Sequence, residues 1–139
     1  MKNILLTLII ALFSFFSFAQ NEWTLYKNIE GVKIYSKDSD CYPKDGMAQT
    51  AVLFRFENTT NRPLTIDWRI RVWYNGEENT KNIGSEENHY YLTLDSMEIK
   101  KGNCELKNNM LFLYKKFLKF EKSSKLTRFE LDDLNVIDK

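Results

Sequence analysis

His89 is the only histidine in the chain, and it stands where an acidic loop meets a predicted strand. A histidine that acts as a general base or a metal ligand needs a neighbouring group to orient it, and no serine, cysteine or aspartate motif supplies one. We therefore expect a solvated histidine at a strand end. The sequence also has no Gly-rich phosphate loop, no His-Glu-x-x-His helix and no nucleophile elbow. This pattern predicts a protein that is not an enzyme and has neither catalytic residues nor a cofactor.

Carboxylates gather in two segments that could coordinate a cation. They are Asp38, Asp40 and Asp45 in the first segment, and Glu77, Glu78, Glu86 and Glu87 in the second. Calcium prefers roughly six to eight oxygen ligands, and neither spacing matches the calcium-binding loop of about twelve residues. We interpret both segments as solvated loops and predict no metal site. The alternative is a small hydrolase or a Ca-dependent enzyme that combines the loop carboxylates with His89.

Aromatic and arginine side chains share one strand face. Trp73 stands on the outward face of its strand, and Asp67 lies on the same side. Exposed aromatic rings with polar neighbours form stacking platforms for sugars or anchors for protein partners. The predicted ligand-binding residues are Trp73, Arg69, Arg71 and Tyr91. The alternative for Trp73 is cross-strand packing or the covering of a sheet edge.

The elements that position these residues alternate apolar and polar side chains, as strands do. In the clearest case, Leu64 to Tyr74, the even-numbered residues are mainly apolar and the odd-numbered ones mainly polar. Such alternation is typical of an antiparallel sheet with one side packed on a core. Thr50 to Glu57 alternates likewise, and the polar stretch Asn58 to Pro63 joins the two. The sequence therefore predicts a β-hairpin.

Further strands are predicted on both sides of this pair. They are Trp23 to Lys27 and Val32 to Ser36, split by Gly31, then Tyr90 to Asp95 and Leu126 to Val136. Met110 to Phe120 also fits a helix face, but its aromatic density favours a strand with an irregularity at Lys115-Lys116. About seven short strands separated by turns indicate an all-β chain. We predict an immunoglobulin-like antiparallel β-sandwich in a single domain.

Residues 1–19 are predicted to be a signal peptide, and residues 20–139 the sandwich domain. Lys2 precedes an apolar run from Ile4 to Phe18, and no acidic residue appears before Glu22. A helix over that run would span about 22 Å, short of the roughly 30 Å hydrocarbon core of a bilayer. Ser17 and Ala19 are spaced as signal peptidase requires. The sequence thus predicts export to the periplasm, the outer surface or the medium, with no stable membrane span after cleavage. An uncleaved anchor is the alternative.

The charge balance argues against one class of partner, and the cysteine content predicts a disulfide. The 20 Lys and Arg residues nearly balance the 19 Asp and Glu residues, which argues against nucleic-acid binding. An oxidising compartment favours pairing of Cys41 with Cys104, so we expect one disulfide; two unpaired thiols are the alternative. These cysteines do not have the spacing of the immunoglobulin disulfide around the core tryptophan, here Trp68.

Four segments resemble small secreted β-sandwich proteins of Bacteroidota. They are Phe18-Ala19-Gln20, Asn58-Thr59-Thr60-Asn61, Tyr74-Asn75-Gly76 and Gly102-Asn103-Cys104. The resemblance implies export and a sandwich fold, and it supplies no activity and no catalytic residues. Asp95-Ser96-Met97 is similar to the acceptor for O-linked glycans in exported proteins of that group, with Ser96 as the modified residue. Asn58-Thr59-Thr60 fits the N-linked acceptor pattern of eukaryotic hosts.

The sequence leads to one main hypothesis, a secreted or periplasmic non-enzymatic module. We expect it to hold an envelope or extracellular protein, or a glycan, on a sheet face or a loop end. A structural envelope protein without a ligand is the other non-enzymatic alternative.

Overall fold

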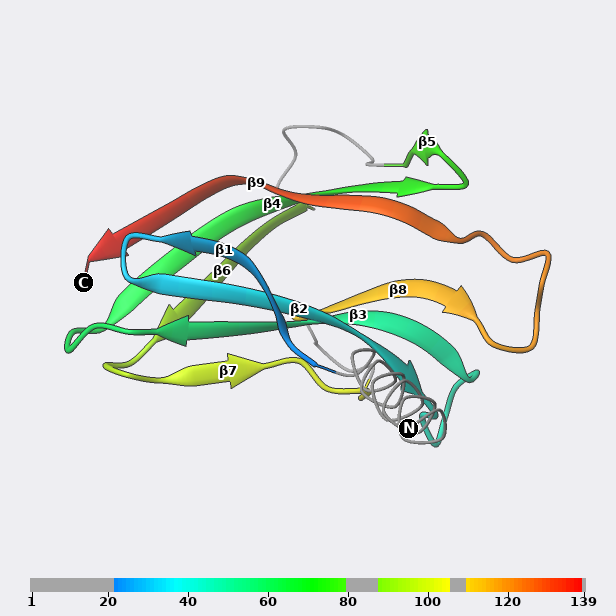
Figure 1. Cartoon of the computed structure of the whole chain (residues 1–139), viewed down its shortest axis with the longest axis horizontal. Coiled ribbons are helices and arrows are strands. Elements are labelled where there is room, and N and C mark those ends of the chain that lie inside the picture. The colour runs from blue at the N-terminus through cyan, green and yellow to red at the C-terminus, as the bar shows by residue number, and fades with distance from the viewer. Residues whose placement is uncertain (1–21, 80–87, 106–109, 139) are drawn as a thin grey trace, which may run out of the picture.

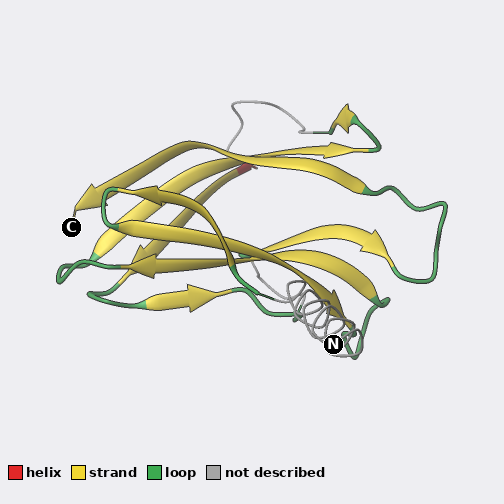
Figure 2. Cartoon of the chain, in the orientation of Figure 1, coloured by secondary structure: helices red, strands yellow, loops and turns green. Residues whose placement is uncertain are grey.

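The computed structural model describes residues 22–79, 88–105 and 110–138, and these form two antiparallel β-sheets that face each other (Figure 1). The strands are β1 (Thr24–Ile29), β2 (Val32–Cys41), β3 (Gln49–Asn58), β4 (Leu64–Tyr74), β5 (Glu77–Glu78), β6 (His89–Leu94), β7 (Ile99–Lys101), β8 (Phe112–Phe117) and β9 (Leu126–Asp138). Figure 2 shows strands joined by loops, and the described part of the chain has no α-helix. Accordingly, no helix in these ranges is long and apolar enough to cross a membrane. The predicted leader, residues 1–19, lies outside the described residues.

The first sheet, sheet A, has the order β1-β2-β3, and both β7 and β8 pair with the free edge of β3. In the second sheet, sheet B, β9 pairs with one edge of β4, while β6 and β5 pair with the other edge. The predicted all-β class with two antiparallel sheets is confirmed. The described strands number nine rather than about seven. β5 and β7, with 2 and 3 residues, are too short to leave an alternating pattern in the sequence.

The core lies between the sheets, and β4 shows how the sequence builds it. This strand has the predicted bounds, and Leu64, Ile66 and Trp68 on its inner face are all buried. The Trp68 ring is stacked between Phe56 of sheet A, at 4.8 Å, and Tyr90 of β6, at 5.8 Å. Because a buried aromatic ring removes a large apolar area from water, this stack is a main contact between the sheets.

The predicted β-hairpin between Thr50–Glu57 and Leu64–Tyr74 is wrong. β3 pairs only with strands of sheet A and β4 only with strands of sheet B, so residues 58–63 carry the chain from one sheet to the other. The apolar faces of the two strands meet across the core instead of lying side by side. Alternation shows which face of a strand is buried, but it does not show which strand is its neighbour.

The side chain of Asn58 holds this crossing in place. Asn58 is fully buried, and its amide group donates to the carbonyl oxygens of Arg62 at 2.7 Å and Asp95 at 2.9 Å. Its side-chain oxygen accepts from the backbone N–H and the hydroxyl of Thr60, at 2.9 and 2.8 Å. Every hydrogen-bonding position of the amide group is therefore used. The amide is also closed to the N-linked modification that its sequence pattern suggested.

The predicted break between two strands at Gly31 and the predicted irregularity at Lys115-Lys116 are both present. β1 and β2 form a hairpin around Glu30 and Gly31, which have φ values of 44° and 83° and so suit a two-residue turn with positive φ. Residues 112–117 form strand β8, a shorter range than predicted, and its pairing with β3 shifts where Thr50 opposes Lys116 and Ala51 opposes Tyr114. Lys115 is the extra residue, so the expected irregularity is a β-bulge.

The predicted disulfide between Cys41 and Cys104 is present, and it lies on the outer side of sheet A. Cys41 alternates with the core-facing residues of β2 and packs with Ala51 and Leu53 of β3. Trp23 and Phe112 cover the same cluster. The bridge therefore closes a second, smaller core outside the sandwich, whereas an immunoglobulin disulfide joins the two sheets through the middle.

Tyr74 makes the inner face of sheet B sensitive to alkaline pH. Burial, with a smaller effect of the neighbouring Tyr114 phenol, raises the pKa of Tyr74 to about 12, and its hydroxyl donates to the Tyr114 carbonyl at 2.8 Å. In the unfolded chain the Tyr74 phenol ionises near pH 10, whereas in the folded protein it stays neutral up to about pH 12. Ionisation therefore stabilises the unfolded state relative to the folded state between about pH 10 and 12. Stability that is complete below pH 10 is therefore lost as the pH rises through 12.

We expect Tyr74→Phe to lose less stability than the original protein between about pH 10 and 12. The free energy of unfolding from urea titrations at several pH values measures this difference. Tyr42→Phe is the matched control, because it removes the phenol hydroxyl of a tyrosine that is 73% exposed. Equal slopes for Tyr74→Phe and the original protein would show that the Tyr74 phenol ionises in the folded state as it does in the unfolded chain.

Candidate binding face

The outer face of sheet B carries the predicted ligand-binding residues. In an antiparallel pair, directly opposed residues project from the same face of the sheet. The register therefore places Trp73, Arg71 and Arg69 of β4 beside Arg128, Glu130 and Asp132 of β9, and places Arg69 and Asp67 beside His89 and Tyr91 of β6. All four predicted residues, Trp73, Arg69, Arg71 and Tyr91, thus share one surface.

Arg71 is surrounded by acidic side chains on this face. Its Nε and one terminal nitrogen donate to the two carboxylate oxygens of Glu78, at 2.8 and 3.0 Å. The other terminal nitrogen lies 3.5 Å from Asp132 and 3.7 Å from Glu130. The hydrogen bond to Glu78 is the main reason that the pKa of Arg71 is raised above its ordinary value. A two-point contact with a carboxylate fixes the orientation of a guanidinium group, so Arg71 is held in place before any ligand arrives.

Trp73 is half-buried, and two arginine side chains make cation–π contacts with its ring. The guanidinium carbon of Arg71 lies 4.9 Å from the centre of its ring, and that of Arg128 lies 4.5 Å away. Both distances are within the range of cation–π attraction. A sugar that stacks on this indole has to share the ring surface with two guanidinium groups. The arrangement suits recognition of mixed aromatic and charged groups better than it suits a bare stacking platform.

His89 begins strand β6, as expected of a histidine at a strand end, but the expectation that it is solvated is wrong. The side chain of His89 is only 15% exposed, its Nδ1 lies 2.9 Å from the Tyr91 hydroxyl, and its Nε2 lies 3.8 Å from Asp67. The rings of His89 and Tyr91 are 4.3 Å apart, while Tyr91 itself is 53% exposed. This cluster depends on the register between β4 and β6. The sequence shows alternation within each strand but not how the two strands align.

Most of the described carboxylates that were predicted to lie in loops belong to strands, while Asp45 lies in an exposed turn as expected. Asp38 and Asp40 belong to strand β2, where Asp38 pairs with Lys115 and Asp40 accepts the Thr50 hydroxyl at 2.8 Å. Glu77 and Glu78 form β5, while Glu86 and Glu87 lie outside the described residues. Within the described ranges, no group of three or more His, Cys, Asp or Glu side chains is arranged to hold a metal ion.

Ser96 lies in an exposed turn between β6 and β7. Its hydroxyl is 3.4 Å from the Thr60 carbonyl oxygen, and the next residue, Met97, is 64% exposed. The side chain is therefore accessible, and O-linked modification of Ser96 stays a prediction.

Comparisons of the chain with protein-family models, with curated proteins and with solved structures found no match in any of the three.

Proposed function

We propose that this protein is an exported, non-enzymatic module that binds a protein partner on the outer face of sheet B. The observation that carries the proposal is the Arg71 guanidinium, which is fixed by Glu78 and lies against the Trp73 ring. Tryptophan, tyrosine and arginine are the residues that contribute most often to protein–protein binding energy. A side chain that is already ordered also loses less conformational entropy when it binds. Export rests on the predicted leader at residues 1–19.

The charge pattern favours a polypeptide over a glycan. Arg71 and Arg128 alternate with Glu78, Glu130 and Asp132 around Trp73. Charges of both signs at fixed positions can select a partner of complementary pattern. A neutral glycan would meet the same charges without compensating ones of its own, and it would compete with two guanidinium groups for the indole. Tyr91, at the other end of the face, offers an exposed aromatic ring to the same partner.

The test is capture of partners from the native envelope with the tagged protein, followed by identification and by titration of the partner found. The double variant Trp73→Ala, Arg71→Ala should weaken binding of that protein at least tenfold. Lys33→Ala is the control, because Lys33 lies on the outer face of sheet A. Thermal unfolding verifies that both variants fold. A double variant that keeps every partner would remove this face from consideration, and capture of glycans alone would overturn the choice of a protein partner.

We also infer that the sandwich is of the immunoglobulin type. Supporting this, β2, β3 and β8 lie in the order of the immunoglobulin strands A, B and E, and β6, β4 and β9 lie in the order of C′, C and F. The core tryptophan, Trp68, then falls on strand C, as in that fold. An experimental structure in which β3 pairs with β4, or β4 does not pair with β9, would overturn the assignment.

A further inference from the structure

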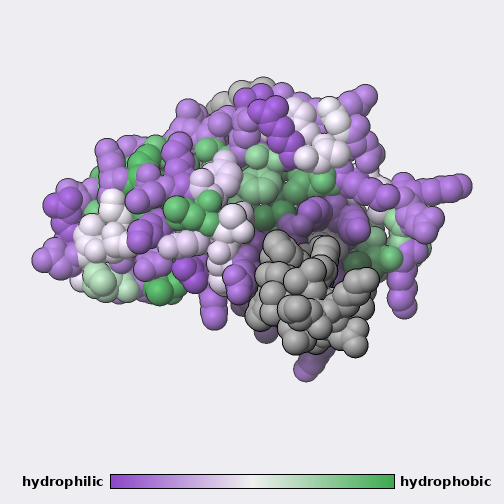
Figure 3. Space-filling view, in the orientation of Figure 1, coloured by the Kyte–Doolittle hydropathy of each residue, from purple (hydrophilic) through white to green (hydrophobic). Residues whose placement is uncertain are grey.

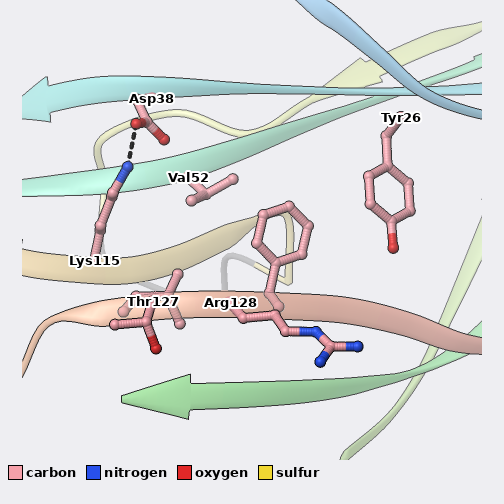
Figure 4. A pocket seen from close by; sticks show the side chains of 8 residues that line it. Tyr26, Asp38, Val52, Lys115, Thr127 and Arg128 are labelled. Carbon is pink, nitrogen blue, oxygen red and sulfur yellow. Dashed lines mark hydrogen bonds and ion pairs between the residues drawn. The ribbon is translucent and has the colours of Figure 1, made fainter. Parts of the chain in front are cut away.

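A cavity of about 330 Å³ opens between the two sheets. The cavity is lined by residues of both sheets: Tyr26 of β1, Asp38 of β2, Val52 of β3, Lys115 of β8, and Leu126, Thr127, Arg128 and Phe129 of β9 (Figure 4). Figure 3 shows apolar surface in the gap between β9 and sheet A, bordered by hydrophilic residues. Small-molecule sites usually measure about 300 to 1,000 Å³, so this one suits a small ligand rather than a large cofactor.

The inner wall of the cavity is apolar and well packed. Val52 and Leu126 are 4% and 8% exposed. The Phe129 ring is stacked on Tyr26 at 5.6 Å and meets the edge of Phe54 at 5.3 Å. These contacts fix the Phe129 ring in position. An aromatic or branched aliphatic group of a ligand would find a preformed surface there.

The polar groups are placed at the rim. Asp38 of β2 and Lys115, the bulge residue of β8, form an ion pair whose side chains are 49% and 32% exposed. Both charges can therefore be reached from solvent. The cavity thus has the Asp38 carboxylate and the Lys115 ammonium group at its rim, beside an apolar wall. The guanidinium of Arg128, which also lines the cavity, lies 4.5 Å from the centre of the Trp73 ring.

We propose that this cavity binds a small zwitterion with an apolar body, the chemistry of an aromatic α-amino acid. A ligand that carries only a carboxylate would be attracted by Lys115 and repelled by Asp38, and one that carries only an ammonium group would meet the reverse. A zwitterion satisfies both charges at once. Its aromatic body packs against Phe129 and Val52. Arg128 lines this cavity and also contacts the Trp73 ring on the outer face of sheet B, so the two sites share one residue. Variants of Asp38 and Lys115 leave the Trp73 face unchanged and therefore test the cavity by itself.

The test is calorimetric titration of the purified protein with L-phenylalanine, phenylacetate, phenethylamine and glycine. L-Phenylalanine should bind at least tenfold more tightly than each of the other three, which lack the ammonium group, the carboxylate and the aromatic body, respectively. Asp38→Asn and Lys115→Gln should each weaken its binding at least tenfold. Lys116→Gln is the matched control, because Lys116 is the next residue along β8 and is exposed, and it should bind as the original protein does.

Three results would overturn the proposal. The first is the absence of L-phenylalanine binding at about 10 mM, weaker than the usual range for a specific small-molecule site. The second is equal binding of the four probes, and the third is unchanged binding by Lys115→Gln. If either charge variant fails to fold, the four probes on the original protein still decide the outcome.

Discussion

Asn58→Ala is expected to lower the free energy of unfolding by about 3 to 5 kcal/mol, measured by urea denaturation. Asn58 is fully buried where the chain passes from β3 to β4, and its amide group makes four hydrogen bonds. Alanine leaves the carbonyl groups of Arg62 and Asp95 and the N–H of Thr60 without these partners. Each buried polar group left unpaired costs about 1 to 3 kcal/mol, and water can reach only part of this region.

Two further variants separate this effect from a general sensitivity of the connection. Asn61→Ala changes an exposed asparagine in the same segment and should alter stability by less than about 0.5 kcal/mol. Asn58→Asp keeps the shape but points a carboxylate oxygen at two carbonyl oxygens, so it should be at least as destabilising as alanine. A cost below about 1 kcal/mol for Asn58→Ala would show that the crossing is held by the strands alone.

The sequence predicted best where one strand is buried on one face along its length. The pattern of β4 is uninterrupted from Leu64 to Tyr74, and the strand has those bounds. β2 was predicted to end at Ser36 but continues to Cys41. Its inward-facing positions beyond Ser36 are Asp38, which lines the open cavity, and Asp40, which accepts the Thr50 hydroxyl. Polar residues that face inward remove the signal on which the prediction depends.

The candidate binding face was predicted only in part, because alternation along one strand does not show which strands lie beside it. The shared face of Trp73, Arg71 and Arg69 follows from alternation along one strand, so it could be seen in the sequence. Their partners Glu78 and Arg128 come from other strands, and only the register between strands brings them together. The cavity could not be predicted at all, because it needs the spacing of the two sheets and a bulge that turns Lys115 toward Asp38.

Removal of the Cys41–Cys104 disulfide is the second change with a large expected effect. The bridge joins residues 63 positions apart, and loop closure of that length stabilises the folded state by roughly 4 kcal/mol in the chain-entropy model. We expect Cys41→Ala with Cys104→Ala to lower the free energy of unfolding by about 2 to 4 kcal/mol, since native strain and residual structure usually reduce the gain. Urea denaturation of the double variant, and of the original protein with reductant, measures this loss.

The location of the bridge predicts how the loss is distributed. The disulfide lies outside the sandwich, in the cluster of Cys41, Ala51 and Leu53. This cluster is separate from the main core around Trp68. Hydrogen exchange should therefore increase most at residues 102–105 and in the adjoining part of β2, while the β4–β9 pair stays protected. An immunoglobulin-type bridge through the core would instead loosen both sheets together. Equal loss of protection in β4 and β2 would contradict an external disulfide, because a bridge on the outer side of sheet A can constrain only that sheet and the segment tied to it.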